Sequence, residues 1–291
     1  MICGEPPEWV ARCAVRSATS LRLTGVVNAN FDRITMRSTP TALAATVALA
    51  LTQPVSAETS DATCRATSAV QQALVVELYT SEGCNSCPPA DRWLSSLKSR
   101  PGVVAAAFHV DYWNSLGWVD RFGSARYTER QAEQLRSAGA GFSYTPQVLV
   151  NGRDWRGAPG LPAALGPALV QIELRRDPDR QVAVRVVPSV GAPARLALWW
   201  ALLEDDHVTV VKAGENQGVT LHHDQVVRQY ARLPEWRVAS GSVAGQPGAA
   251  HELRLDPMVS RNAEGGHKAR LLVVVTDAIT GLPLQAAQLN C

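Results

Sequence analysis

Two cysteines separated by two residues, Cys84 and Cys87, stand where a buried strand is expected to meet a helix. Residues 74–79 (LVVELY) form a short apolar run typical of a buried strand. Pro88 and Pro89 follow the second cysteine directly, and proline is favoured in the first turn of a helix because that turn does not use the missing N–H group. A fold that contains this segment therefore places both thiols at the amino-terminal end of a helix.

Strands and helices are expected to alternate through the first half of the chain. Residues 103–110 (VVAAAFHV) predict a second buried strand, and residues 124–137 are polar with helical spacing. Residues 147–156 predict a hairpin, because they flank an Asn-Gly pair that suits a two-residue turn, and 161–174 are expected to form a last helix. This order, with C-x-x-C at the first strand-to-helix junction, resembles the thioredoxin fold. It predicts an α/β thioredoxin-like domain at 70–178.

The second half of the chain has a different texture. Short apolar runs are separated by Gly, Pro, Asn and Asp, which is typical of strands joined by turns. The runs are 181–187, 195–203, 207–212, 225–233, 251–255 and 269–277. Their spacing predicts a β-rich domain at 179–291, in the form of a small antiparallel sandwich that follows the α/β domain.

The thioredoxin resemblance assigns different roles to the two cysteines. The amino end of a helix offers unpaired N–H groups and the positive end of the helix dipole, and both stabilise a thiolate. Cys84 is therefore expected to be the exposed thiol that attacks a substrate, and Cys87 the shielded thiol that resolves the mixed disulfide. We interpret the chain as a thiol-disulfide oxidoreductase whose substrate or redox partner is a protein or a small thiol. This reaction needs no bound cofactor and no metal.

Further site residues follow from the same resemblance. Thr145-Pro146 directly precedes the predicted hairpin and is similar to the cis-proline loop that thioredoxin-like proteins set opposite their cysteines. Thr145 would then present its backbone to an extended substrate segment. The buried acid that moves protons in thioredoxins has no counterpart at its usual place. Glu77, His109 and Asp111 are the remaining candidates for proton handling, although strand alternation turns Glu77 toward the other face.

Several longer segments narrow the resemblance to one family. VVELYTSEGCNSCPPADRWL, FHVDYWNSLGW and YTPQVLVNGR lie in the first half of the chain, and AGENQGVTLHHDQVVR lies in the second. Together these segments resemble a secreted bacterial family, the domain of unknown function numbered twelve twenty-three, over nearly all of residues 74–291. The family name carries no reaction, so the resemblance implies membership rather than an activity.

The amino-terminal part of the chain is expected to direct export. Residues 36–57 combine a positive charge, an apolar run too short to span a bilayer and small residues at the end, a pattern typical of a cleaved signal peptide. Residues 1–35 show no sustained periodicity and are expected to be a non-native or disordered extension, and 58–69 a linker. The protein would then be periplasmic or secreted, with no membrane span after cleavage.

Export would determine which cysteines remain in the mature protein and whether they can form disulfides. Four cysteines follow residue 57, which is an even number in a compartment where disulfides persist. Cys84 and Cys87 are close enough to pair with each other. Cys64 and Cys291 are left to form a structural disulfide between the two ends, and this second bridge is a hypothesis.

Two other functions remain open at this point. Exported proteins can hold copper with two thiolates and one imidazole, so Cys84, Cys87 and His109 form a candidate copper site. A hydrogen bond from His109 to Asp111 is the simpler interpretation of that histidine. In the second alternative the two cysteines are a permanent staple, and the protein is a binding module whose β domain recognises a partner.

Charge and residue spacing argue against several other classes. The chain has 28 basic and 26 acidic residues, and a net charge of +2 creates no broad field to draw it onto nucleic acid or an anionic membrane. One C-x-x-C pair does not supply the four ligands of a structural zinc site. His222 and His223 are neighbours on an expected strand and point to opposite faces, so at most one of them can join a given site.

Overall fold

The computed structural model describes residues 64–137, 142–156, 160–163, 165–239, 247–257 and 266–290. The predicted extension at 1–35, the predicted signal peptide at 36–57 and most of the predicted linker at 58–69 lie outside these ranges. The described residues contain two α-helices, one short 3-10 helix and fourteen β-strands. No helix among them is long and apolar enough to cross a membrane.

The largest element is an eight-stranded sheet in the order β14-β13-β8-β11-β3-β2-β4-β5. Its strands are β2 (Leu74–Thr80), β3 (Val103–His109), β4 (Gln147–Val150), β5 (Arg153–Asp154), β8 (Arg195–Glu204), β11 (Val226–Arg237), β13 (Ala269–Asp277) and β14 (Pro283–Leu289). Strands β2 and β3 are parallel and almost wholly buried, which explains their continuous apolar sequences. The carboxyl-terminal strands join them directly, because Val226 of β11 pairs in parallel with Ala107 of β3.

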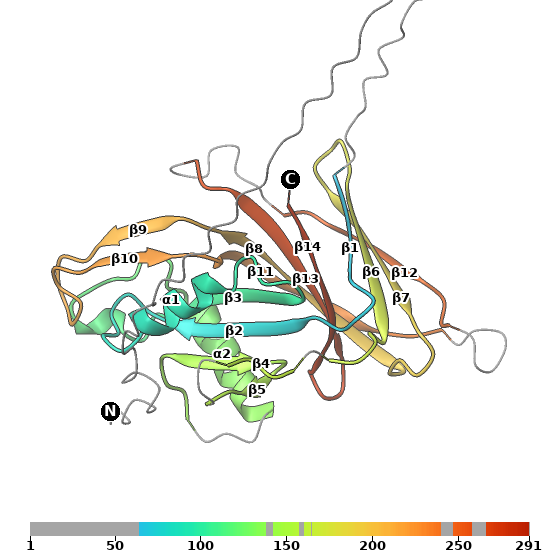
Figure 1. Ribbon diagram of the computed structural model, residues 1–291, viewed down its shortest axis with the longest axis horizontal. Helices are drawn as coiled ribbons and strands as arrows, with labels where there is room; N and C mark the ends of the chain where they lie inside the picture. The colour runs from blue at the N-terminus through green and yellow to red at the C-terminus, as the bar shows by residue number, and fades with distance from the viewer. Residues whose placement is uncertain are drawn as a thin grey trace, which may run out of the picture. The chain divides into compact units, whose positions relative to one another are not determined.

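A second sheet of four strands packs against part of the first. It contains β1 (Arg65–Thr67), β6 (Val170–Arg176), β7 (Val182–Pro188) and β12 (His251–Leu255), in the order β1-β6-β7-β12. Val182, Val184 and Val186 alternate with half-exposed residues along β7 and are buried. They share an apolar core with residues of β8 such as Leu196 and Leu198, so this core lies between the two sheets (Figure 1).

The two helices cover opposite faces of the β2–β3 pair. Helix α1 (Pro88–Ser96) packs its Leu94 against Val76 of β2, whereas helix α2 (Ala125–Ser137) packs its Tyr127 against Phe108 of β3. The short 3-10 helix η2 (Asn114–Leu116) follows β3. A separate two-stranded hairpin of β9 (His207–Val210) and β10 (Thr220–His223) runs beside α1 (Figure 1).

The expected fold class is wrong. We predicted an α/β thioredoxin-like domain followed by a β-rich domain that forms a separate antiparallel sandwich. The described chain is instead mostly β-sheet, with only two α-helices. Strands from both halves form one continuous eight-stranded sheet. The sequence signals each strand locally but does not say which strand lies beside it, and the pairing of β11 with β3 was therefore missed.

The individual elements were predicted more accurately than their arrangement. The structure confirms strands near 74–79 and 103–110, helices after Cys87 and near 124–137, and the hairpin at Asn-Gly. The prediction of a helix at 161–174 is wrong, because residues 170–174 belong to strand β6. Val170, Ile172 and Leu174 are buried at every second position there, and this two-residue period was read as helical.

Two of the predicted segment limits lie between strands of one sheet. Strand β1 lies inside the stretch 58–69 that was expected to be a linker, and it pairs with β6. The limit expected between 178 and 179 falls in the turn that joins β6 to β7, two paired strands of one sheet. Residues on both sides of each limit therefore contribute to a common sheet.

Candidate functional site

Cys84 and Cys87 form a disulfide at the amino-terminal end of α1, with their Cα atoms 5.5 Å apart. Cys87 is the N-cap of the helix, and Pro88 and Pro89 occupy the first turn, as the sequence predicts. Pro88 and Pro89 carry no N–H group, so the first turn offers few hydrogen-bond donors to the sulfurs, and the helix dipole is the main favourable effect there. The Ser86 hydroxyl supplies one polar neighbour, since its Oγ lies 3.4 Å from the Cys84 Sγ.

Both cysteines are inaccessible to solvent, with exposed fractions of 0% for Cys84 and 0% for Cys87. We expected Cys84 to be the exposed member of the pair, and this expectation is wrong. A turn from the second half of the chain is hydrogen-bonded to the backbone beside the disulfide, and we infer that it covers the sulfurs. Sequence position alone cannot reveal such a cover.

The cover is the turn between β9 and β10, residues 214–218. Asn216 is 5% exposed, and its Nδ2 donates hydrogen bonds to the carbonyl oxygens of Glu82, at 2.9 Å, and Cys84, at 3.0 Å. The backbone N–H of Asn85 donates to the Glu215 carboxylate at 3.2 Å. These contacts join the covering turn to the amino-terminal side of the disulfide loop, at residues 82–85. We refer to residues 214–218 as the covering turn.

The peptide bond between Thr145 and Pro146 is cis, as predicted. Gln147, the next residue, pairs with Tyr79 of β2, so this bond lies at the end of the sheet from which the disulfide loop departs. Trp113 lies close to both features. Its Nε1 donates to the Thr145 hydroxyl at 2.8 Å, and its Cβ would lie 3.1 Å from a Cβ added at Gly83 in the disulfide loop.

His109 and Asp120 form a buried ion pair at the carboxyl end of β3. The His109 Nδ1 lies 2.7 Å from the Asp120 Oδ2, which also accepts a hydrogen bond from the backbone N–H of Glu82. The other oxygen of Asp120 accepts from the backbone N–H of Phe122 at 2.8 Å. Burial opposes both charges, but their mutual attraction raises the pKa of His109 and lowers the pKa of Asp120.

Glu82 and His223 lie next to the His109–Asp120 pair and add two more buried ionisable groups. The Glu82 carboxylate lies 3.4 Å from the His223 Nε2 and accepts a hydrogen bond from the Trp118 Nε1 at 2.8 Å. Burial would raise the pKa of Glu82, but the hydrogen bonds, chiefly the one with His223, lower it. The ring centroids of His223 and His109 are 5.0 Å apart, edge to face. His223 is buried and His222 exposed, which confirms that the two neighbours point to opposite faces.

Asp91 completes the cluster from the first turn of α1. Its side chain is buried, and burial raises its pKa, although the nearby imidazoles of His223 and His109 act in the opposite direction. Thr80, at the end of β2, lowers the pKa of Asp91 and pairs in register with His109 on β3. We refer to Glu82, Asp91, His109, Asp120 and His223 as the polar cluster.

The structure separates Glu77 and Asp111 from the polar cluster. Glu77 points to the face of the sheet that α2 covers, where it forms a buried ion pair with Arg130 at 2.8 Å. Asp111 accepts a hydrogen bond from the Thr128 hydroxyl of α2 at 2.6 Å, and His109 pairs with Asp120 instead. Of the three predicted proton-handling residues, His109 alone belongs to the cluster beside α1.

Sequence reasoning missed Asp91, Asp120 and Asn216, and it gave Glu82 no role. A signal for most of them was available. Asp91 and Glu82 lie in the quoted segment around the cysteines, and Asn216 and His223 lie in the quoted segment AGENQGVTLHHDQVVR. The structure brings these two segments together around one disulfide.

The predicted second disulfide is only partly visible. Cys64 is disulfide-bonded and packs beside the core between the two sheets. Cys291, its predicted partner, lies outside the described residues. The pairing of these two cysteines stays a prediction.

The described residues contain no group of three or more His, Cys, Asp or Glu side chains arranged to hold a metal ion. In the alternative copper site, His109 would be the third ligand beside Cys84 and Cys87. Its Nδ1 is engaged by Asp120, and its Nε2 is buried without a hydrogen-bond partner. Because Cys84 and Cys87 are joined in a disulfide, the three side chains are not arranged as a copper site in the described part of the chain.

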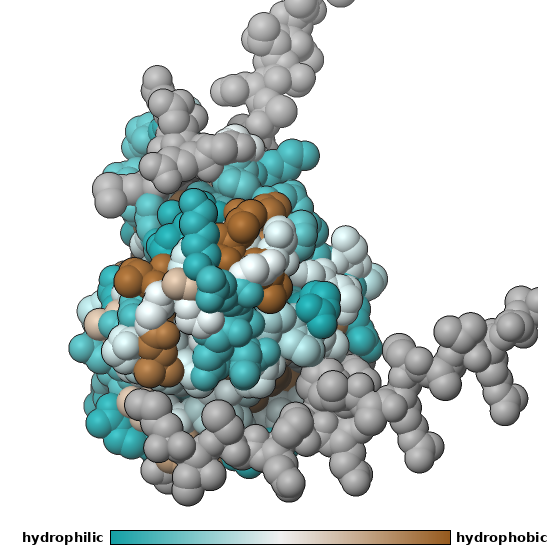
Figure 2. Space-filling model, turned by 90° about the vertical axis from the view of Figure 1, so that its left-hand side faces the viewer, coloured by the Kyte–Doolittle hydropathy of each residue, from teal (hydrophilic) through white to brown (hydrophobic). Residues whose placement is uncertain are grey.

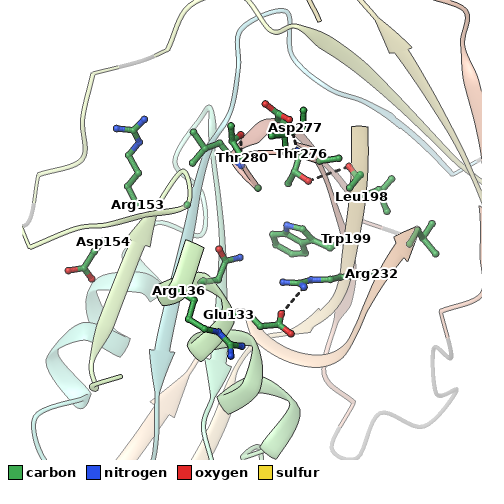
Figure 3. A pocket seen from close by; sticks show the side chains of 18 residues that line it. Glu133, Arg136, Arg153, Asp154, Leu198, Trp199, Arg232, Thr276, Asp277 and Thr280 are labelled. Atoms are coloured by element: carbon green, nitrogen blue, oxygen red, sulfur yellow. Dashed lines mark hydrogen bonds and ion pairs between the residues drawn. The ribbon is translucent and has the colours of Figure 1, made fainter. Parts of the chain in front are cut away.

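A surface pocket of about 980 Å³ lies away from the disulfide, between α2, the β4–β5 hairpin and the turn that joins β13 to β14 (Figure 3). An ion pair between Glu133 and Arg232, at 2.7 Å, crosses one side of it, and Trp199 lies beside them. Basic side chains such as Arg153 are balanced by acidic ones such as Asp154. The pocket contains no cysteine or histidine, so it is separate from the disulfide and its polar cluster.

These features define a β-rich protein in which a buried disulfide at the start of a helix is enclosed by a polar cluster and a covering turn. The chain belongs to the family described as "Protein of unknown function (DUF1223)", which matches residues 75–274. The predicted family membership is therefore confirmed. The match includes both the disulfide loop and the covering turn.

Solved structures resemble the chain more distantly. The crystal structure of protein AGR_C_4864 from Agrobacterium tumefaciens is similar with a TM-score of 0.55 and 25% identity, over 76% of this chain and 96% of that one. HBP35 of Porphyromonas gingivalis matches with a TM-score of 0.48 and 14% identity, over 77% of this chain and 76% of that one. No curated protein matches the chain.

Proposed function

We propose that this protein performs thiol–disulfide exchange through Cys84 and Cys87 on a protein substrate or redox partner, in the periplasm or outside the cell. The observation that carries the proposal is the disulfide at the start of α1 with the cis Thr145–Pro146 bond beside it, joined through Trp113. The export pattern at residues 36–57 supports the location.

The proposed reaction has two steps. In the reduced protein the Cys84 thiolate attacks a substrate disulfide, forms a mixed disulfide and releases one substrate thiol. Cys87 then attacks the Cys84 sulfur, which forms the Cys84–Cys87 disulfide and releases the second substrate thiol. The start of α1 favours the thiolate at Cys84 through the helix dipole. The same steps in reverse oxidise a substrate dithiol.

A protein substrate is supported by apolar side chains around the covering turn. Five large hydrophobic residues are exposed on or near the hairpin: Leu116, Val119, Val208, Val210 and Val219. Exposed apolar groups that gather on one part of a surface mark sites of contact with other proteins. Figure 2 shows one face of the molecule, on which apolar side chains form patches between hydrophilic ones.

Because neither sulfur is exposed, exchange requires the covering turn to move away from the disulfide loop. The cover is held by two hydrogen bonds from Asn216 and one from the Asn85 N–H group to Glu215. Local openings of this size are ordinary in folded proteins, because loops open at a small fraction of the global unfolding free energy. The cover therefore slows exchange without preventing it.

The experiment that tests the proposal uses Cys84→Ser and Cys87→Ser. Each variant is incubated with oxidised glutathione, and peptide mass spectrometry measures the glutathione bound at the remaining cysteine. We expect Cys87→Ser to accumulate a stable adduct at Cys84, because no resolving thiol remains. Cys84→Ser is the matched control, and we expect much less adduct on it.

The permanent-staple alternative predicts a different result. If neither variant forms an adduct under native conditions, while both do so after unfolding in urea, the pair does not exchange and the proposal is wrong. Equal adduct on both variants would also contradict it, because the proposed roles of Cys84 and Cys87 are asymmetric.

A further inference from the structure

The second step of the proposed exchange requires a base that the sequence did not identify. Cys87 must lose its thiol proton as it attacks the Cys84 sulfur, because the thiolate is the nucleophile. Cys87 is fully buried while the covering turn is in place. A buried side chain beside Cys87 is therefore better placed than bulk water to accept this proton.

Position on the helix selects Asp91. Residues four apart on a helix lie on one face with their Cβ atoms about 6 Å apart. Asp91 is the fourth residue after Cys87, its backbone N–H bonds to the Cys87 carbonyl at 3.1 Å, and its side chain is 6% exposed. Both side chains are therefore buried together at the start of α1.

The other buried acids are engaged or distant. Both oxygens of Asp120 are occupied, by His109 and by backbone N–H groups. Both oxygens of Glu82 face partners as well, His223 on one side and an indole N–H on the other. Glu77 lies on the opposite face of the sheet, against α2.

We infer that Asp91 is the base that accepts the proton of Cys87 during resolution of the mixed disulfide, and that the imidazoles of His109 and His223 tune its carboxylate. This inference rests on the proposed function. The groups that face Asp91 come from every element around it: Thr80 from β2, His109 from β3, His223 from β10 and the carboxylate of Asp120 from the loop after β3.

The proton balance of the step is complete. The Cys87 thiol proton passes to the Asp91 carboxylate, and the Cys87 sulfur forms a bond to the Cys84 sulfur. The bond between Cys84 and the substrate sulfur breaks, and the substrate leaves as a thiolate that takes up a proton. Burial raises the pKa of Asp91 toward that of a thiol, which makes the transfer between them more evenly matched.

The test compares Asp91→Asn with Asp111→Asn, a control that changes another acid of the same region but outside the cluster. The reduced protein is reacted with oxidised glutathione, and the rate of adduct resolution is measured against pH. Positioned proton transfer contributes about 100-fold or more, so we expect Asp91→Asn to resolve at least about 100-fold more slowly. Its rate should rise steadily with pH, without the inflection of the wild type. Asp111→Asn should match the wild type.

A second variant tests the role of the histidines. His223→Gln removes the imidazole whose electrostatic interaction lowers the pKa of Asp91, so the inflection of the resolution rate should move to higher pH. A purely structural role for His223 would change the rate without moving the inflection. An unmoved inflection would contradict the tuning role.

A spectroscopic readout separates failure of this inference from failure of the proposed function. The 13Cβ chemical shift of Cys87 in the reduced protein reports its ionisation and needs no substrate. Asp91→Asn should lower the pKa of the Cys87 thiol, because an amide replaces a nearby carboxylate. If wild-type protein forms no glutathione adduct, the proposed function fails, and this titration still decides whether Asp91 is coupled to Cys87. An unchanged Cys87 titration, or a resolution rate within twofold of wild type, overturns the inference.

Discussion

Replacing Asn216 with alanine should open the covering turn and expose the disulfide. The Nδ2 group of Asn216 donates to two buried carbonyl oxygens, those of Glu82 and Cys84. Each such hydrogen bond contributes about 1 kcal/mol net, and the pair therefore holds the turn closed by about 2 kcal/mol. Since 1.4 kcal/mol corresponds to a factor of ten, the open population should rise about 30-fold.

The assay is the rate at which a water-soluble phosphine reduces the Cys84–Cys87 disulfide under native conditions. Samples are quenched with an alkylating reagent, and the labelled peptide is quantified by mass spectrometry. With the reductant in excess, the rate follows the open population, so Asn216→Ala should be reduced about 30-fold faster than wild type. Glu215→Ala loses one exposed hydrogen bond of about 0.5 kcal/mol and should be about twofold faster.

Gln217→Ala is the matched control in the same turn, because the Gln217 side chain is exposed. Its reduction rate should equal that of wild type. Urea unfolding of each variant shows whether a faster rate reflects local opening or loss of global stability. If Asn216→Ala is reduced at the wild-type rate, the covering turn does not control access to the disulfide.

Two further predictions concern the buried ion pairs. Asp120→Asn should lower the free energy of unfolding by about 3 kcal/mol at about pH 5, measured by urea unfolding. The ion pair with His109 stabilises the fold fully between pH 3.8 and 6.5, the ordinary pKa values of the two side chains. This stabilisation is lost as the pH falls through the lowered pKa of Asp120, and also as the pH rises through the raised pKa of His109. The difference in unfolding free energy between Asp120→Asn and wild type should therefore shrink in alkaline solution. Arg130→Met should cost about 4 kcal/mol, because it leaves Glu77 buried without its partner. Adding Glu77→Gln to Arg130→Met should restore most of that stability, and an unrestored double variant would show that packing of the guanidinium against aromatic rings, rather than the charge, holds this region.

Local sequence signals were sufficient for much of the site. The apolar run before the cysteines, the prolines after them and the Asn-Gly pair each act on neighbouring residues, and the structure confirms the strand, the helix and the hairpin. The cis bond at Pro146 was also predicted correctly. The strand, the helix and the hairpin depend on backbone preferences within a few residues, which a sequence states directly. The cis bond followed instead from the resemblance of Thr145-Pro146 to a known loop.

Long-range pairing could not be read in the same way. Asn216 is 132 residues from Cys84, and Asp120 is 38 residues from Glu82, yet both pairs are hydrogen-bonded. Strand β11 also shows the same apolar pattern whether it pairs within a separate sandwich or with β3. The sequence therefore indicated the strands but not the continuous sheet, and the cysteines but not their cover.

The polar cluster bears on the choice between a working disulfide and a staple. A structural disulfide is stable in a purely apolar setting, where no charge has to be desolvated. Burying ionisable groups is costly, and ion pairs in an interior are often no more stable than apolar packing of the same volume. Here five such groups, the polar cluster, are buried on the elements that adjoin the disulfide. Groups whose pKa values are shifted and that gather at one place are typical of sites that move protons. A permanent structural disulfide does not account for the cost of burying these ionisable groups. Thiol–disulfide exchange does account for it, because each of its steps needs a proton to be removed or supplied beside a buried sulfur.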